Sequence, residues 1–323
     1  MKLASRISAR LRDTGLRGAS RAVARAAGRG AFRLRHARPW QADRLDLARS
    51  GGLGDVLMCT PVAREIKRRN PDCRIRFFTD YGDLVRGLPQ FDEVLPFEAH
   101  PWTALHLEYR APVPVGRHLA QAIAADLGME IEDVRPDCVV RPEADDEADR
   151  LTAPAGRRPV VLLQRSASGW TPNKDWPADR WRSLAEMLRP HAFLIEIGGA
   201  EPEDSPMATD LDLRGATPLA TLAALVASAD LLIGPDSGPI HLAAAFETPS
   251  ITIYGGYLHP THTAYRRNVA FDTPLWCAPC WLRAPCPYGL PCMTAIAPRA
   301  VADAAQAILR AGSAERRVLT SAR

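Results

Sequence analysis

The residues best suited to chemistry in this chain follow an apolar stretch that ends at Gly234. A Pro-Asp-Ser-Gly turn occupies 235–238, and a run of small residues that contains His241 comes directly after it. The first N–H groups of a helix have no partner inside the helix, so such a turn is suited to bind an anion. Asp236 and Ser237 are also residue types that cap helices, so an ordinary capped strand–turn–helix junction is the alternative.

A second turn of the same design lies nearly two hundred residues earlier, at 50–55, where the sequence is Ser-Gly-Gly-Leu-Gly-Asp. Its glycines would let a ligand approach the backbone closely. Gly52 and Gly54 match the first two glycines of the G-x-G-x-x-G dinucleotide motif, but Leu57 stands at the third. Only Asp80 could serve as the ribose-binding acid. The sequence therefore argues against a nicotinamide-dependent fold.

Four of the seven cysteines cluster in a loop that is rich in Pro and Trp, with the spacing C-x2-C-x5-C-x5-C: Cys277, Cys280, Cys286 and Cys292. Four thiols in so short a loop could hold one structural zinc or iron ion tetrahedrally. The x5 spacings differ from those of common zinc ribbons, so paired or free thiols are the alternatives. Cys59, Cys73 and Cys138 are scattered and are expected to be core or surface residues.

Strand and helix patterns alternate on both sides of a Pro- and acid-rich segment, 141–158, which is expected to be a linker. Predicted strands cover 44–49, 75–78, 93–97, 159–163, 193–197, 230–234 and 250–254. Predicted helices run to about residue 69, with Thr60-Pro61 as a cap and first helical position, and cover 178–189, 218–228 and 239–246. This alternation predicts an α/β protein with parallel sheets, whose ligands lie beyond the carboxyl ends of the strands.

Length and composition fit two globular domains. The chain has 323 residues, of which 46% are hydrophobic and 24% charged. It contains no run of eighteen apolar residues, so no membrane-spanning helix is expected.

The charge is distributed unevenly along the chain. Of the net charge of +4, residues 1–40 hold eleven Lys/Arg and a single acid, which leaves the remainder at −6. Apolar and basic residues recur there every four positions: Leu3, Ile7, Leu11, then Arg17, Arg21, Arg25, Arg29 and Arg33. This pattern is typical of a basic amphipathic helix on an anionic membrane surface. A solvated tail, a nucleic-acid-binding arm and an organelle transit peptide are the alternatives.

Several separated motifs, in order, resemble those of glycosyltransferase family 9, the bacterial lipopolysaccharide heptosyltransferases. They are Gly-Leu-Gly-Asp-Val at 52–56 with Thr60-Pro61, Lys-Asp-Trp-Pro at 174–177, Gly-Gly-Ala-Glu at 198–201, Asp-Ser-Gly-Pro-Ile-His-Leu at 236–242 and the cysteine loop. The resemblance covers about 44–310 and implies a GT-B fold, in which two Rossmann-like domains face a cleft. It divides the chain into a basic arm (1–43), an acceptor domain (44–150), a nucleotide-sugar domain (151–312) with the Cys-rich loop 277–292, and a tail (313–323).

Transfer from a nucleotide diphosphate sugar needs a base for the acceptor hydroxyl and stabilisation of the departing diphosphate. Asp55 is the expected base, with helix capping as the alternative. Lys174 and the N–H groups near Ser237 and Gly238 are expected to hold the diphosphate. The other expected donor-site residues are Gly52, Gly54, Glu201, Asp236 and His241. Glu201 is expected to bind the ribose hydroxyls or to cap the following helix. Asp236 is expected to bind a sugar hydroxyl or to stabilise the turn, and His241 to donate to a phosphate or to pack in the core. No cofactor is expected to be required for catalysis.

The expected function is inverting transfer of heptose from ADP-heptose to a lipopolysaccharide inner-core acceptor, by a cytoplasmic enzyme bound peripherally at the inner membrane face. The expected partners are the nucleotide sugar, a lipid-linked saccharide and an anionic membrane surface, and no nucleic acid. One alternative is transfer of another sugar, or glycosylation of a protein. An alternative of another class is a nucleic-acid-binding protein with a basic arm and a four-cysteine metal knuckle, which the acidic body and the lack of an RNA-module aromatic signature disfavour.

Overall fold

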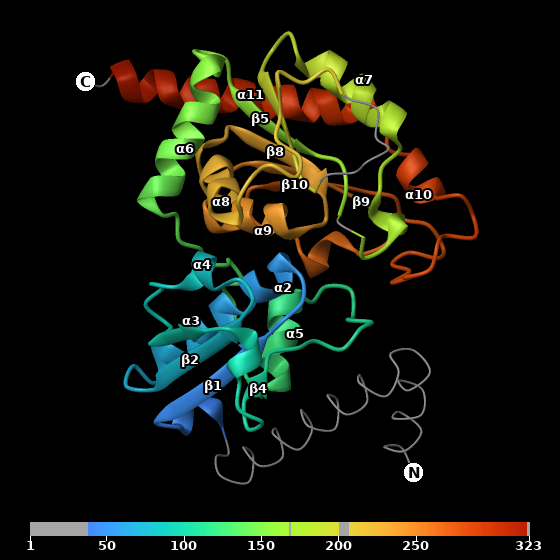
Figure 1. Ribbon diagram of the computed structural model, residues 1–323. Helices are drawn as coiled ribbons and strands as arrows, with labels where there is room; N and C mark the ends of the chain where they lie inside the picture. The colour runs from blue at the N-terminus through green and yellow to red at the C-terminus, as the bar shows by residue number, and fades with distance from the viewer. Residues whose placement is uncertain (1–37, 168, 200–206, 322–323) are drawn as a thin grey trace.

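The computed structural model describes residues 38–167, 169–199 and 207–321, which form two α/β units in succession (Figure 1). Each unit is built on one parallel sheet, with strand order β3-β2-β1-β4 in the first and β10-β9-β8-β5-β6-β7 in the second. The prediction of an α/β protein with parallel sheets is confirmed. The predicted arm pattern over residues 3–33 and the predicted donor residue Glu201 lie outside the described residues.

The first unit alternates short strands and helices. Its strands are β1 (Arg44–Arg49), β2 (Arg74–Thr79), β3 (Glu93–Leu95) and β4 (Leu105–His106), and its helices are α2 (Leu53–Leu57), α3 (Thr60–Arg69), α4 (Gly82–Val85) and α5 (Leu119–Asp126), with single 3-10 turns η1 (Pro39–Gln41) and η2 (Phe97–Ala99). In the central pair β1–β2, Leu45 lies opposite Ile75 and Leu47 opposite Phe77, and all four side chains are buried. Burial of these apolar residues fixes the register of the strand that leads to the first glycine turn.

The second unit has a larger sheet. Its strands are β5 (Val160–Gln164), β6 (Phe193–Ile197), β7 (Leu211–Asp212), β8 (Leu231–Pro235), β9 (Ser250–Gly255) and β10 (Asn268–Asp272). Its helices are α6 (Pro142–Thr152), α7 (Ala178–Leu188), α8 (Leu219–Ser228), α9 (Gly238–Ala245), α10 (Pro291–Thr294) and α11 (Pro298–Ser321), with 3-10 turns η3 (Ala153–Ala155), η4 (Pro172–Lys174) and η5 (Pro260–His262).

Helices cover both faces of the second sheet. Val161 and Leu163 of β5 belong to the apolar cluster that contains residues of α7 and α11. Their neighbour Leu162 belongs to the cluster that contains residues of α6, α8 and α9. Strands that are buried on both faces read as continuous apolar runs, which is why these central strands were predicted to within a residue at their ends.

The expected linker 141–158 is wrong over most of its length, because α6 forms there and packs against α8. The exposed face of α6 is acidic, whereas its two small residues Ala144 and Ala148 are buried and contact the core. Helix α6 therefore goes with the second unit, whereas the predicted boundary at 150 assigned it to the first. Helix α11 continues to Ser321, into the segment expected to be a tail (313–323).

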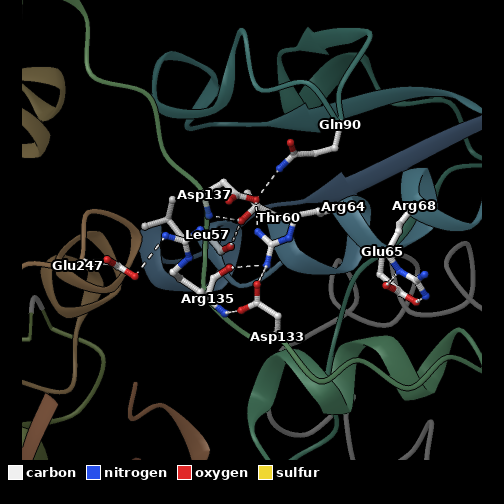
Figure 2. Close-up of polar contacts among 10 residues, drawn as sticks. All are labelled: Leu57, Thr60, Arg64, Glu65, Arg68, Gln90, Asp133, Arg135, Asp137 and Glu247. Carbon is white, nitrogen blue, oxygen red and sulfur yellow. Dashed lines mark hydrogen bonds and ion pairs between the residues drawn. The ribbon is translucent and has the colours of Figure 1, made fainter. Parts of the chain in front are cut away.

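The predicted single helix after the first turn is two helices, α2 and α3. Cys59 rather than Thr60 is the N-cap residue of α3, and the Thr60 hydroxyl donates to the carbonyl of Leu57 at 2.8 Å. The same hydroxyl oxygen accepts the backbone N–H of Asp137 at 2.7 Å (Figure 2). The break between the helices is thus stabilised by the segment that connects α5 to α6.

That connecting segment is anchored by charge. Arg64 of α3 forms ion pairs with Asp133, at 2.9 Å, and with Asp137, which also accepts from Gln90 (Figure 2). Between these two aspartates, Arg135 forms an ion pair with Glu247 of the second unit at 3.6 Å. The segment is thus held both to α3 and to the second unit.

Candidate functional site

Asp55 lies on α2, one turn after the end of β1. Gly51 has φ +115°, a conformation that favours glycine and lets the chain reverse directly after the strand. The Asp55 carboxylate accepts the N–H of Gly52 at 3.2 Å through Oδ2, and its Oδ1 lies 2.7 Å from Nη2 of Arg49. With a quarter of its side chain exposed (25%), Asp55 both stabilises the start of α2 and remains accessible to a ligand.

Arg49 is the basic residue that pairs with Asp55, and the sequence predicted it only as the end of a strand. Its Nη1 donates to the carbonyl of Leu107 at 2.7 Å, and its guanidinium lies 5.6 Å from the centre of the Tyr109 ring. Only 11% of the side chain is exposed. The sequence did contain a signal for Arg49, because a basic residue at the end of a parallel strand lies at the same edge of the sheet as the glycine turn that follows it.

The second turn holds an aspartate in a different way. Lys174, at the end of η4, places Nζ 2.6 Å from Oδ2 of Asp236, and the Thr263 hydroxyl donates to Oδ1 at 2.7 Å. Burial alone would raise the pKa of Asp236, but Lys174, His241 and Thr263 together hold it below its ordinary value. Lys174 and Asp236, which lie far apart in the sequence, therefore form a nearly buried ion pair.

Two further groups fix the Lys174 ammonium. It donates to the backbone carbonyl of Asp236 at 3.0 Å and lies 4.9 Å from the centre of the Tyr257 ring. The structure thus places Lys174 against the 236–241 turn. Tyr257 was not singled out from the sequence, since cation–π contacts leave no local pattern.

The expected side-chain caps on α9 do not form. The Ser237 hydroxyl donates to Oε1 of Gln164 at 2.6 Å, and Asp236 is engaged with Lys174 and Thr263. Within the described hydrogen bonds no side chain caps this helix. The capped junction is therefore not what the described residues form, and anion binding at the α9 start stays a prediction.

The two glycine turns lie against each other across the boundary between the units, where α2 contacts α9 (Figure 1). A Cβ on Gly54 would lie 2.6 Å from Nε2 of His241, and a Cβ on Gly238 would lie 2.8 Å from Cδ2 of Leu53. The sequence analysis gave both glycines to ligand approach. In the structure each also makes room for a side chain of the other unit.

His241 is buried at this junction. Its Nδ1 hydrogen-bonds the Tyr265 hydroxyl at 2.6 Å. Burial lowers the pKa of His241, against the opposing effects of Asp236 and Asp55, so the ring is neutral at pH 7. Of its two expected roles, the packing role is the one these contacts display.

The cysteine loop is fastened to the element that presents Lys174. The Asn173 side chain donates to the carbonyls of Leu282 and Ala284, at 2.6 and 2.7 Å, and accepts the N–H of Cys286 at 2.9 Å. Thr171 adds a bond to Leu282 at 3.1 Å.

All four thiols of this loop are free, with Cys280 exposed, Cys292 buried, and Cys277 and Cys286 partly buried. Throughout the described ranges, no three His, Cys, Asp or Glu side chains form a group that could hold a metal ion. The structural metal expected for this loop stays a prediction.

In the part of the chain that the structure describes, no helix combines the length and the apolar character needed to cross a membrane.

Comparison with known proteins places these features in a family. The family model of glycosyltransferase family 9 (heptosyltransferase) matches residues 104–288, more than half of the chain. Lipooligosaccharide heptosyltransferase 2 of Haemophilus influenzae is 28% identical over 174 residues, which cover 48% of this chain and 49% of that protein. The chain thus aligns with only about half the length of this curated relative.

Solved structures agree in fold. A family 9 glycosyltransferase from Veillonella parvula matches with a TM-score of 0.65 at 18% identity, covering 82% of this chain and 97% of that one. E. coli ADP-heptose lps heptosyltransferase II matches with a TM-score of 0.61 at 18% identity, covering 84% and 99%. The two parallel-sheet units are those of a GT-B fold, as expected. The chain belongs to glycosyltransferase family 9.

Proposed function

We propose that this protein is an inverting heptosyltransferase that moves heptose from ADP-heptose to a lipopolysaccharide inner-core acceptor. Family membership and the names of the relatives support the reaction class. The observation that carries the proposal is the contact between the two glycine turns. It brings the accessible carboxylate of Asp55 to the same junction as the Lys174–Asp236 pair and the uncapped start of α9.

In the proposed step, the acceptor hydroxyl oxygen attacks the anomeric carbon and its proton passes to the Asp55 carboxylate. The bond from the anomeric carbon to the diphosphate oxygen breaks, and the electron pair leaves with ADP. A single displacement inverts the anomeric configuration. Arg49 holds one carboxylate oxygen in place, which leaves the group oriented for proton transfer at modest conformational cost.

The diphosphate is assigned to the start of α9 and to Lys174. Backbone N–H groups at a helix start and a fixed ammonium both favour the negative charge that grows as the bond breaks. Both are already positioned, because Asp236, Thr263 and Tyr257 hold Lys174 and its surroundings. We propose that these groups suffice without a metal ion. Retained turnover after exhaustive chelation supports this, and loss of turnover that Mg²⁺ restores contradicts it.

A thermal-shift panel of ADP, UDP, GDP and NAD tests the donor assignment. A ligand at about one hundred times its Kd adds roughly 2.7 kcal/mol to the free energy of unfolding. We expect ADP to raise Tm the most. A larger shift with UDP or GDP would change the nucleotide, and a shift with NAD alone would overturn the proposal.

A structural metal in the cysteine loop stays a prediction for elemental analysis of protein purified without added metal. Less than about a tenth of an equivalent of zinc or iron would exclude it, since a structural site retains its metal through purification.

We also propose that the basic arm, 1–43, holds the enzyme at an anionic membrane surface, where a lipid-linked acceptor would be concentrated. Removing residues 1–40 is expected to lower activity on membrane-embedded acceptor and to leave ADP affinity unchanged. Binding of full-length protein to anionic vesicles should weaken with salt, because the Debye length falls from about 10 Å at 0.1 M to about 3 Å at 1 M. Vesicle binding by the truncated protein would contradict the proposal, and tighter binding to nucleic acid than to vesicles at matched salt would favour the nucleic-acid alternative.

A further inference from the structure

A histidine outside the predicted site lies at the junction of the two units with one ring nitrogen unpaired. His118 precedes α5 in the first unit and is only 5% exposed. Its ring centre lies 5.0 Å from that of Tyr265, which in turn bonds His241 of α9. Through Tyr265, His118 is thus packed next to the residue that follows the donor turn of the second unit.

The segment before α5 is held against the second unit. The N–H of Gly116 donates to the Thr261 hydroxyl at 2.9 Å, and Nε2 of His262 bonds the carbonyl of Val113 at 3.0 Å. These two contacts fix the approach of the chain to His118. The position of this ring is therefore determined by both units.

Helix capping determines which nitrogen of His118 carries the proton. Nδ1 accepts the N–H of Ala120 at 3.2 Å, while Gln121 accepts the N–H of His118 at 3.1 Å. Burial, assisted by His241, lowers the pKa of His118 to about 3, so the ring is neutral at pH 7. A neutral imidazole whose Nδ1 accepts must carry its proton on Nε2.

The Nε2–H donor has no hydrogen-bond acceptor among the described residues, although the atom is buried. A buried donor without a partner costs about 1–3 kcal/mol, so such a group calls for an explanation. The aromatic face of Tyr265 is a weak substitute, because N–H···π contacts are second-order interactions. An acceptor oxygen brought by a ligand at the donor turn would satisfy it.

We infer that His118 is a substrate-binding residue, whose Nε2–H donates to an oxygen of the nucleotide sugar bound at the Asp236 turn. This inference rests on the proposed function. The oxygen belongs either to the diphosphate or to a sugar hydroxyl, and both are acceptors of the same kind. His118, on the first unit, thus contacts a donor that is held by the second unit.

The test separates the two nitrogens of the ring. His118→Asn keeps an oxygen near Nδ1, and Asn is a good N-cap residue, but it removes the Nε2 donor. His118→Gln places an amide donor near Nε2. His191→Asn, at an exposed histidine of the second unit, is the matched control.

We expect His118→Asn to fold with a Tm near that of the wild type and to bind ADP-heptose about 3–12-fold more weakly, as loss of one neutral hydrogen bond predicts. His118→Gln should recover part of the affinity, and His191→Asn should match the wild type. If ADP affinity falls together with that for ADP-heptose, the acceptor is a diphosphate oxygen. If only ADP-heptose affinity falls, the acceptor is a sugar hydroxyl.

Titration calorimetry with ADP and with ADP-heptose gives both affinities. A folded His118→Asn variant that binds both ligands within twofold of the wild type overturns the role of His118 and leaves the proposed function standing. A wild-type protein that binds neither ligand overturns the proposed function and this inference together. The two failures are therefore distinguishable.

Discussion

The two glycine turns each carry an aspartate, and the fold uses the two carboxylates differently. Asp55 keeps 25% of its side chain exposed and shares its oxygens between Arg49 and one backbone N–H. Asp236 is 7% exposed, and its oxygens are taken by Lys174 and Thr263. An exposed, oriented carboxylate is suited to exchange a proton with a substrate. A buried one that is fully engaged is suited to hold a cation in place.

Replacing the accessible carboxylate gives the sharpest test of this contrast. Asp55→Asn should lower kcat by about 10²–10⁴, because the amide cannot take the acceptor proton. ADP affinity should stay within about twofold, since the donor turn lies on the other unit. Turnover measured alongside ADP binding checks both. Near wild-type kcat in this variant would remove Asp55 from the mechanism.

The buried carboxylate should matter most for stability. Asp236→Ala leaves the Lys174 ammonium without its counter-ion, which should cost about 3–5 kcal/mol of unfolding free energy. Asp55→Ala loses one helix-start bond and the ion pair with Arg49, but Arg49 keeps its bond to the Leu107 carbonyl and its contact with the Tyr109 ring, so the loss should be smaller. Urea unfolding of both variants measures the difference. Equal losses would mean that the two carboxylates do not have the separate roles described above.

Substitution of Gly54 or Gly52 tests how closely the two glycine turns are packed against each other. Gly54→Ala places a methyl group against the His241 ring, which is held by Tyr265, and should cost about 1–3 kcal/mol. Gly52→Ala is the matched control, because its Cβ would meet only Asp55 Oδ2 at 3.4 Å and its φ of −72° suits alanine. Its effect should stay within about 1 kcal/mol. Comparable unfolding curves for the two variants would contradict the tight contact at Gly54.

The buried histidines at the junction give a prediction for the pH dependence of stability. Burial holds the pKa of His118, at about 3, well below its ordinary 6.5, and lowers those of His241 and His262 too. Between these values the unfolded chain binds more protons than the folded one. Stability is therefore complete above pH 6.5 and is lost as the pH falls, by up to about 1.4 kcal/mol per pH unit for each histidine.

Unfolding free energies at pH 7.5 and 5.5 measure this loss. His118→Asn should show a shallower dependence than the wild type, because one of the three buried rings is gone. His191→Asn should keep the full slope. A wild-type stability that does not change over this range would contradict the burial of neutral histidines at the junction.

The local patterns of the sequence predicted most of the scaffold. Strands such as 193–197 were recovered because continuous apolar runs bounded by turns have few other structures to adopt. The motif residues Asp55, Lys174, Asp236, Ser237, Gly238 and His241 were also singled out from the sequence, and their roles stay predictions. Helix α6 was missed because its acidic and Pro-containing surface outweighed two small buried alanines, and its packing partner α8 lies about seventy residues away.

By itself, the sequence determined the two parallel-sheet units, the two glycine turns and the residue types that could exchange a proton or bind phosphate, since each depends on short-range spacing. Tertiary structure alone decided which charges pair. Arg49 with Asp55, Lys174 with Asp236, and His118 beside Tyr265 all depend on how strand ends and units meet. Burial and contact between distant segments set these pairings, and neither is encoded in any local run of residues.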